Sequence, residues 1–425
     1  MTYSAEIISV GTELLLGNTA NTDARDLSQM LSELGIDVFY HTVVGDNDER
    51  LKKIVNIARA RSNIIITTGG LGPTYDDMTK QTLAECFGKR LVFDESEAEI
   101  IRSYFSERLH STKMTDNNLR QALLPEGCTV FHNLCGTAPG CAFESDGVHV
   151  LMLPGPPREC ASMFKNCAAP YLRKLSDSII VSHKINIFGK GESLVEDMLS
   201  TIMPKLSNPT LAPYAKEGEV MLRLTAKAAT ENEAGSLMQP VLTNVLGILG
   251  DFVYGVDTDS FESAVLKLLS DKKKTVVTAE SCTGGMISKR LTDVPGASAS
   301  FLGGVVTYSN SSKTELLGVP EDVLSIHGAV SKECAEKMAL GVRARLAADI
   351  GISVTGIAGP SNDSMYKDIG LVYVALAAKD GLYCRQLHLG SDRYRVRTVA
   401  SNHAFDMIRR YLSGLPVEAD WAEEK

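Results

Sequence analysis

The chain has 425 residues, enough for about three domains at roughly 150 residues each. Hydrophobic residues make up 44% and charged residues 22%, which excludes disorder, collagen and a long coiled coil as the main organisation. Asp and Glu number 52 against 43 Lys and Arg, so the formal charge is −9 and no nucleic-acid partner is expected.

The sequence gives no sign of a membrane or export segment. No stretch approaches 18 uninterrupted apolar residues, so no membrane partner is expected. Met1–Glu6 shows neither the basic head nor the apolar core of a signal peptide. The nine cysteines include no Cys-x-x-Cys pair and match no common zinc spacing. We therefore expect reduced thiols and a cytoplasmic protein.

The first third alternates strand and helix patterns. Strands are predicted at 7–10, 36–44 and 63–68, with helices after Asn21–Asp23 and from about Leu51. A β-α-β-α-β series of this kind predicts a parallel, doubly wound sheet. Ligands of such sheets bind beyond the carboxyl ends of the strands, where Gly11 and the glycines of 69–72 are expected to lie.

The remaining two thirds divide into a small domain and a second α/β sandwich. Prolines punctuate 171–258, which holds one well-marked strand at 219–225 and is interpreted as a small α+β linker domain. Beyond it, helices are predicted at 261–269, 332–348 and 392–411, and strands at 275–279, 301–308, 350–355, 371–378 and 382–389. The predicted fold is two doubly wound α/β sandwiches, 1–170 and 259–425, joined by 171–258.

Three loops of small residues in the first domain suggest a phosphate site. They are 69–77, 136–140 and 153–157, and glycine lets the backbone approach an anion closely. Asp76 and Asp77 are candidates to hold a divalent metal against a pyrophosphate, one of them touching the metal because adjacent helical residues diverge. The plainer alternatives are a tight strand–helix connection and a carboxylate that complements the helix dipole.

In the last domain, the turn 279–285 follows a strand and opens a helix. It would expose the Ser281 hydroxyl beside the N–H groups of the helix start, which could stabilise an oxyanion. Serine needs a base, and neither His327 nor His388 lies at a persuasive place. Lys313 is the better candidate if burial, with a cation from Arg393, Arg395 or Arg397, lowers its pKa. Alternatively, Ser281 is a plain N-cap and Lys313 a surface residue.

These motifs, in order along the chain, make the first domain resemble the molybdopterin-binding fold of competence/damage-inducible proteins of the CinA family. The resemblance implies an ADP-ribose pyrophosphatase that uses a divalent metal (Mg, Mn or Co), with K+ as a further candidate. It implies metal binding by Asp76 and Asp77. It rests on Val10–Gly17, Thr68–Thr79, Asn118–Ala122, Gly136–Gly140 and Leu153–Glu159. The residues that it implies for substrate binding are Gly11, Glu13, Gly69, Gly70, Gly72, Thr74, Gly136, Thr137, Pro154 and Gly155.

The last domain resembles the C-terminal domain of the same family, which is similar to nicotinamide-mononucleotide amidohydrolase. The stretches that carry this are 279–285, 308–313, 328–331, 355–360 and 392–397. The resemblance implies Ser281 as nucleophile, Lys313 as its base, Tyr308 in a proton relay and Thr355 lining the site, without a cofactor. It further implies substrate binding by Gly284, Gly285 and either Arg393 or Arg397, with Arg395 left open, and a homodimer.

The sequence departs from the family pattern in one loop. After Pro360 the family loop is rich in glycine, whereas this chain has Asn362 and Asp363, and a carboxylate there could repel a phosphate-bearing substrate. The leading hypothesis is a bifunctional hydrolase of pyridine-nucleotide salvage. The alternatives are a non-catalytic pterin- or nucleotide-binding protein related to molybdenum-cofactor biosynthesis and a competence-related interaction protein.

Overall fold

The computed structural model describes residues 3–108, 114–175, 179–360, 367–390 and 392–418. These form two structural units, residues 1–181 with 226–236, and residues 182–225 with 237–425. Among the described residues, no helix has the length and apolar character needed to cross a membrane.

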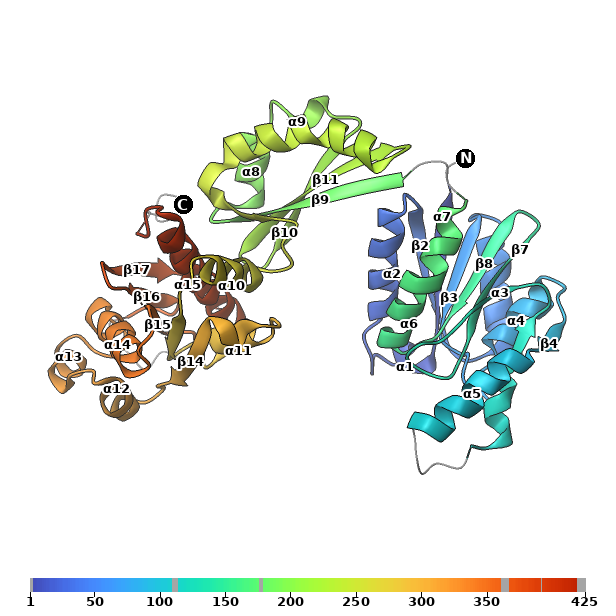
Figure 1. Ribbon diagram of the computed structural model, residues 1–425, viewed down its shortest axis with the longest axis horizontal. Coiled ribbons are helices and arrows are strands. Elements are labelled where there is room, and N and C mark those ends of the chain that lie inside the picture. The colour runs from blue at the N-terminus through green and yellow to red at the C-terminus, as the bar shows by residue number, and fades with distance from the viewer. Residues whose placement is uncertain (1–2, 109–113, 176–178, 361–366, 391, 419–425) are drawn as a thin grey trace. The chain divides into compact units, whose positions relative to one another are not determined.

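The first unit is built on a six-stranded sheet of order β2-β1-β3-β8-β7-β6 (Figure 1). Strands β2, β1, β3 and β8 run parallel, and the hairpin partners β7 and β6 run antiparallel. A separate ribbon pairs β4 with β5. The strands are β1 (Ser4–Val10), β2 (Asp37–Val44), β3 (Ile64–Thr68), β4 (Leu91–Phe93), β5 (Leu123–Pro125), β6 (Thr129–Phe131), β7 (Gly140–Ser145) and β8 (Val148–Leu153).

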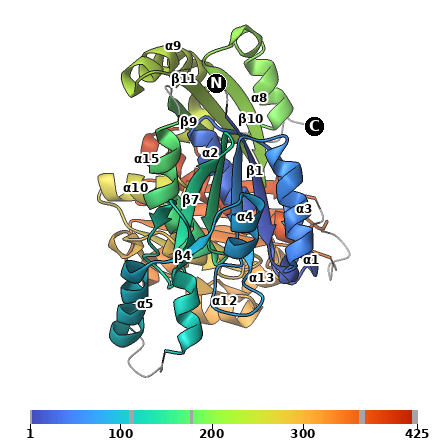
Figure 2. The same cartoon turned by 90° about the vertical axis from the view of Figure 1, so that its right-hand side faces the viewer.

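Helices cover both faces of this sheet, because successive strand residues point to opposite sides. Ile64 and Ile66 pack in one core with α2, α6 and α7, while Ile65 packs in the other with α3 and α4. Helix α5 extends beyond the sheet (Figure 2). The helices are α1 (Thr12–Leu15), α2 (Thr22–Glu33), α3 (Asp48–Arg59), α4 (Thr79–Cys86), α5 (Glu95–Arg108), α6 (Pro157–Met163) and α7 (Ala169–Arg173), with a π-helical turn at Phe164–Ala168.

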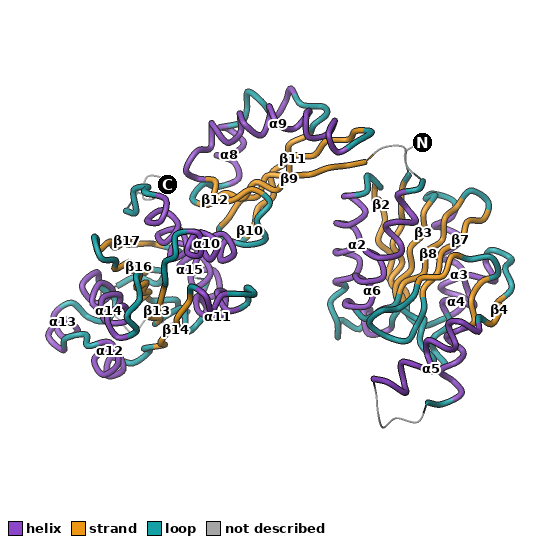
Figure 3. Tube along the Cα trace, in the orientation of Figure 1, coloured by secondary structure: helices purple, strands orange, loops and turns teal. Residues whose placement is uncertain are grey.

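The middle of the chain forms a four-stranded sheet of order β10-β11-β9-β12. Helices α8 and α9 lie on one face of it (Figure 3). The single well-marked strand of the sequence becomes β11, whose alternate residues Val220, Leu222 and Leu224 are buried. The elements are β9 (Ile179–Phe188), α8 (Glu192–Met198), β10 (Thr210–Lys216), β11 (Glu219–Ala228), α9 (Glu231–Leu249) and β12 (Val253–Val256).

The last third contains a five-stranded sheet of order β14-β13-β15-β16-β17. Strands β14, β13 and β15 are parallel, whereas β16 and β17 are antiparallel additions. The carboxyl ends of β13 and β14 are therefore neighbours. The strands are β13 (Val276–Glu280), β14 (Phe301–Val306), β15 (Ile350–Gly356), β16 (Leu371–Ala377) and β17 (Leu382–His388).

Helices again cover both faces, so the predicted α/β class is confirmed. Helices α10 and α15 pack with Ile350, Ile352 and Val354 in one core, and α14 packs with Val277 and Ala279 in the other. The helices are α10 (Phe261–Asp271), α11 (Met286–Thr292), α12 (Asn310–Leu317), α13 (Glu321–Ile326), α14 (Lys332–Arg345) and α15 (Arg393–Ser413).

A buried carboxylate in α15, Asp406, is surrounded by Arg385, Arg409 and Arg410 at 2.8, 2.7 and 3.2 Å. All four side chains are at least 95% buried. Each arginine also donates to a backbone carbonyl, so the cluster joins α15 to neighbouring segments. The carbonyl groups belong to Asp251, Val253, Pro416 and Val417.

Candidate active sites

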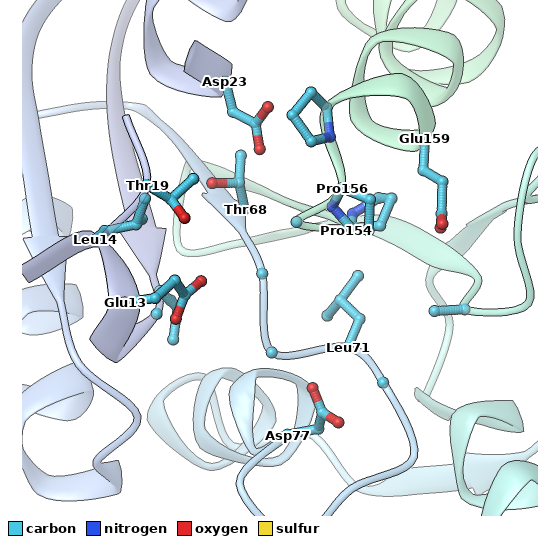
Figure 4. A pocket seen from close by; sticks show the side chains of 18 of the residues that line it. Glu13, Leu14, Thr19, Asp23, Thr68, Leu71, Asp77, Pro154, Pro156 and Glu159 are labelled. Atoms are coloured by element: carbon cyan, nitrogen blue, oxygen red, sulfur yellow. The ribbon is translucent and has the colours of Figure 1, made fainter. Parts of the chain in front are cut away.

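The first unit has a cavity of about 550 Å³ beyond the carboxyl ends of β1, β3 and β8, which we call the acidic cavity. Figure 4 shows the carboxylates of Glu13, Asp23 and Asp77 turned toward the space between these strand ends. Its acidic lining residues are Glu13, Asp23, Asp46, Asp76, Asp77 and Glu159. Among the described residues, none that lines it is basic.

The predicted glycine loop forms one wall because only glycine fits there. Gly69 has a φ of 94°, and a Cβ at this position would lie 2.2 Å from the carbonyl oxygen of Val10. Its neighbour Gly70 has a φ of 66°, and a Cβ there would meet Thr79 Oγ1 at 2.2 Å. Both glycines are therefore required by the close approach of β1 and α4 to the loop.

Asp76 and Asp77 lie in the loop before α4 and not on the helix, so helical geometry gives no reason to expect that only one of them touches a metal. Both line the acidic cavity. The Thr74 hydroxyl lies 2.5 Å from a carboxylate oxygen of each, and the Thr74 N–H donates to Asp77 over 2.7 Å. The hydrogen bond from the Thr74 hydroxyl to Asp76 lowers the pKa of Asp76, which favours the ionised carboxylate.

The donor set at Asp76 and Asp77 fits a hard divalent cation such as Mg²⁺ only in part. Within the described ranges, no group of three or more acidic, His or Cys side chains is placed to hold a metal by itself. Mg²⁺ is commonly bound by one or two carboxylates, with substrate phosphates and water completing the shell. The two aspartates suit that second arrangement.

Most of the predicted binding residues of this domain line the acidic cavity, together with several residues that the sequence analysis did not single out. Thr74 and Gly136 do not line it. Asp23, Asp46 and Glu159 were missed, and burial next to Asp26 raises the pKa of Asp23 to about 6. Asp46 could have been found, because it follows a predicted strand. The predicted residues that do line the cavity are Gly11, Glu13, Gly69, Gly70, Gly72, Asp76, Asp77, Thr137, Pro154 and Gly155.

In the last domain, Ser281 and Lys313 meet at the carboxyl ends of two neighbouring strands. Ser281 follows β13, and Lys313 lies on α12, which follows β14. The Lys313 Nζ is 3.2 Å from the Ser281 Oγ. The same amine donates to the carbonyl of Thr307 over 2.8 Å and to that of Tyr308 over 3.3 Å.

Lys313 is buried, with 1% of its surface exposed. No carboxylate forms an ion pair with it within the part of the chain that the structure describes. Burial lowers its pKa, and the neighbouring Cys334 and Cys282 oppose this only in part. A buried amine without a counter-ion favours its uncharged form, which is the form that accepts a proton.

The three candidate arginines have different surroundings, and only Arg393 lines the cavity beside Ser281. Arg393 also donates to the Gly359 carbonyl over 2.7 Å. Arg397 does not line this cavity; its guanidinium holds the Thr283 carbonyl at 2.7 Å. Arg395 pairs with Glu217 on the surface. None of these arginine contacts involves Lys313, so burial, and not a neighbouring arginine, is the main cause of its lowered pKa.

Tyr308 and Thr355 both line the cavity, as the resemblance implied for Thr355. The Tyr308 side chain is largely exposed, and within the described residues its hydroxyl makes no hydrogen bond to Ser281 or Lys313. Its contact with Lys313 runs through the backbone carbonyl, so the predicted relay has no direct path. The Thr355 hydroxyl donates to the Ala329 carbonyl over 2.7 Å.

The N–H groups of the helix start were expected to stabilise an oxyanion, but two of them are already bonded to Glu280, a residue that the sequence analysis did not single out. Glu280 accepts hydrogen bonds from the backbone N–H groups of Ile287 and Ser288 at the start of α11. Gly284 and Gly285, with φ of 60° and 90°, form the intervening turn and do not line the cavity. The residues of the turn that line the cavity are Ser281 and Cys282.

The cavity around Ser281, which we call the serine cavity, has a volume of about 790 Å³. His327 and Lys367 line it together with Arg393, and no Asp or Glu among the described residues does. His327 was set aside on sequence alone and Lys367 was missed, because two separate loops bring them to the site: His327 follows α13, and Lys367 precedes β16. Asn362 and Asp363 lie outside the described residues.

Three family models match consecutive parts of the chain. "Probable molybdopterin binding domain" matches residues 6–174, "Damage-inducible protein CinA KH domain" matches 182–255 and "CinA C-terminal domain" matches 258–412. The first and last of these matches contain the two cavities described above.

Full-length relatives cover all three regions. A protein of Acetivibrio thermocellus named as competence-damage inducible is 48% identical over 97% of this chain and 99% of its own. A CinA-like protein of Dictyoglomus turgidum is 45% identical over 96% and 99%. A solved CinA structure from Thermoplasma acidophilum, titled as of unknown function, is 32% identical over 40% of this chain and 98% of its own, with a TM-score of 0.37. The chain belongs to the CinA family.

Proposed function

We propose that the last domain hydrolyses the carboxamide of nicotinamide mononucleotide to nicotinate mononucleotide and ammonia. The observation that carries this is the 3.2 Å contact between the Ser281 hydroxyl and a buried Lys313 amine. An uncharged amine has two N–H groups and one lone pair. The carbonyls of Thr307 and Tyr308 accept the two N–H groups, and the lone pair then faces the serine hydroxyl.

The reaction follows from this arrangement. Ser281 Oγ attacks the carboxamide carbon while its proton passes to Lys313 Nζ. Collapse of the tetrahedral intermediate breaks the C–N bond, and Lys313 returns the proton to the leaving ammonia. Water then attacks the acyl-serine ester with Lys313 again as base, which releases the carboxylic acid. Arg393 and Lys367 in a cavity without described carboxylates suit the substrate's phosphate.

Ammonia release from nicotinamide mononucleotide by the purified full-length chain tests this proposal. We expect Ser281→Ala to lower the rate by about 10³-fold or more, since the nucleophile is lost. Ser270→Ala, which removes an exposed hydroxyl from α10, is the matched control and should keep the full rate. Turnover that survives in Ser281→Ala would disprove the assignment of the nucleophile.

The acidic cavity supports a second activity in the first domain, metal-dependent hydrolysis of the pyrophosphate of ADP-ribose. Without a metal, the six carboxylates would repel a pyrophosphate, since no described residue that lines the cavity is basic. A divalent metal held by Asp76 and Asp77 would neutralise the phosphates and polarise the bond that breaks. ADP-ribose with Mg²⁺, Mn²⁺ or Co²⁺ should give AMP and ribose 5-phosphate. Tight pterin binding without this turnover would favour the non-catalytic alternative instead.

A further inference from the structure

Glu280 is a buried carboxylate directly before the proposed nucleophile. It ends β13, and none of its surface is exposed. No basic side chain pairs with it in the described part of the chain. A carboxylate in that position is costly unless hydrogen bonds satisfy its oxygens.

Three donors satisfy Glu280, and all of them come from the start of α11. The backbone N–H groups of Ile287 and Ser288 lie at 3.1 and 2.8 Å, and the Ser288 hydroxyl lies at 2.7 Å. The first N–H groups of a helix have no partner within the helix. The N-cap residue of α11 is Gly285, which has no side chain to supply one. Glu280 therefore caps α11 from the preceding strand.

This cap closes the turn that carries Ser281. Chain positions 281–285 leave β13 at Glu280 and enter α11 at Met286, so the Glu280 side chain bridges both ends of the turn. Few other contacts hold the turn: Ser281 N donates to Val354, Gly284 N to Ser281, and Arg397 to Thr283. Two glycines in the turn would otherwise give it many conformations.

We propose that Glu280 is a positioning residue for Ser281. Its carboxylate fixes the turn so that the Ser281 hydroxyl stays within reach of the Lys313 amine. The inference rests on the proposed function of Ser281 and adds how that serine is held. Misplacing a reacting group by about 1 Å costs on the order of 100-fold in rate.

Glu280→Gln tests the proposal, because the amide keeps the shape but turns an NH₂ group toward N–H donors. The readout is the rate at which a fluorophosphonate labels Ser281, followed by intact mass, together with kcat and KM for nicotinamide mononucleotide. We expect labelling and kcat to fall about 30- to 100-fold and KM to change less than about threefold. The pH profile should keep its shape, because Lys313 is untouched.

Asp349→Asn is the matched control. The Asp349 carboxylate also accepts a backbone N–H and a hydroxyl, from Thr275 just before β13, at the opposite end of the strand from Ser281. We expect this variant to lose thermal stability but to label within about twofold of the unaltered chain. If Glu280→Gln labels as fast as Asp349→Asn at matched melting temperature, Glu280 is only structural and the proposal fails.

Two further results keep the test decisive. If Glu280→Gln does not fold, Ser288→Ala removes one of the three donors and should slow labelling about three- to tenfold; an unchanged rate would overturn the proposal. If the unaltered chain labels at Ser281 but releases no ammonia, the substrate proposal fails and the labelling comparison still judges Glu280. If the unaltered chain does not label, both proposals fail.

Discussion

The two cavities lie at equivalent places in similar sheets but carry opposite charge. Both open beyond the carboxyl ends of parallel strands, as doubly wound folds predict. The acidic cavity is lined by six carboxylates and no described basic residue, whereas the serine cavity has Arg393, Lys367 and His327 and no described carboxylate.

This difference in charge indicates that the two cavities would bind phosphate-bearing ligands in different ways. A cavity that already holds negative charge needs a cation to accept a pyrophosphate. A cavity with its own fixed cations does not. The fold therefore supplies the place, and the residues at the strand ends decide whether the chemistry needs a metal.

The largest expected effect is the loss of amide hydrolysis, and of that activity alone, when Lys313 is replaced. Lys313→Met keeps most of the side-chain volume but removes the amine that faces Ser281. We expect amide hydrolysis to fall about 10³-fold or more, because serine is a poor nucleophile without a base. Hydrolysis of ADP-ribose by the same preparation serves as the internal control and should be unchanged.

Metal removal should produce the reverse pattern. With EDTA, we expect cleavage of ADP-ribose to fall about 100-fold or more, while ammonia release from nicotinamide mononucleotide stays within about twofold. Both rates are measured on one dialysed sample and again after Mg²⁺ is restored. Loss of both activities would show that the contrast in charge does not separate the two chemistries.

Arg393 should govern binding of a phosphate more than chemistry. Arg393→Met removes the guanidinium that lines the serine cavity, and we expect KM for nicotinamide mononucleotide to rise about 10- to 100-fold, as for the loss of a charge-assisted hydrogen bond. The unphosphorylated nucleoside should show no such change. Equal effects on both substrates would indicate that Arg393 acts through the Gly359 loop that it contacts.

The pH dependence of amide hydrolysis should follow Lys313. Burial lowers the pKa of this amine from its usual 10.5, and only the uncharged form accepts the serine proton. The value of kcat/KM should therefore decrease about tenfold per pH unit below the lowered pKa and level off above it. A profile that is flat over the acid range would mean that another group is the base.

The smallest effect is expected at Arg395, which lies two residues from Arg393 but pairs with Glu217 on the surface. Exposed ion pairs contribute about 0–1 kcal/mol, so Arg395→Ala should leave both activities and the melting temperature nearly unchanged. A tenfold rise in KM for nicotinamide mononucleotide would place Arg395 at the phosphate and reverse the distinction drawn between these arginines.

The sequence predicted the location of the two cavities better than the orientation of the side chains that line them. Glycine-containing turns at predicted strand ends indicated where both cavities lie. Ser281 and Lys313 each follow a predicted strand, and they were expected to lie near each other as nucleophile and base. Their catalytic roles stay predictions. The relay role of Tyr308 also stays a prediction; the sequence did not show that its backbone carbonyl, and not its hydroxyl, contacts Lys313.

Residues that were missed share a physical reason. His327 and Lys367 reach the serine cavity through loops whose paths depend on tertiary packing. Asp23 lies on α2 and Glu159 on α6, the helices that come after β1 and β8, and the sequence does not show that these strands lie on either side of β3. Glu280 fell in the predicted turn 279–285 with no role assigned to it, and only its burial with three donors reveals its position.

The arginine cluster around Asp406 has a consequence for any attempt to isolate the last domain. Arg409 donates to the carbonyls of Asp251 and Val253, which precede that domain in the chain. A fragment cut at residue 258 would keep three guanidinium groups around one carboxylate but lose two of the acceptors that balance them. Such a fragment should need either a compensating anion or a redesigned α15 before its rate of nicotinamide mononucleotide hydrolysis, the proposed activity, can be compared fairly with that of the intact chain.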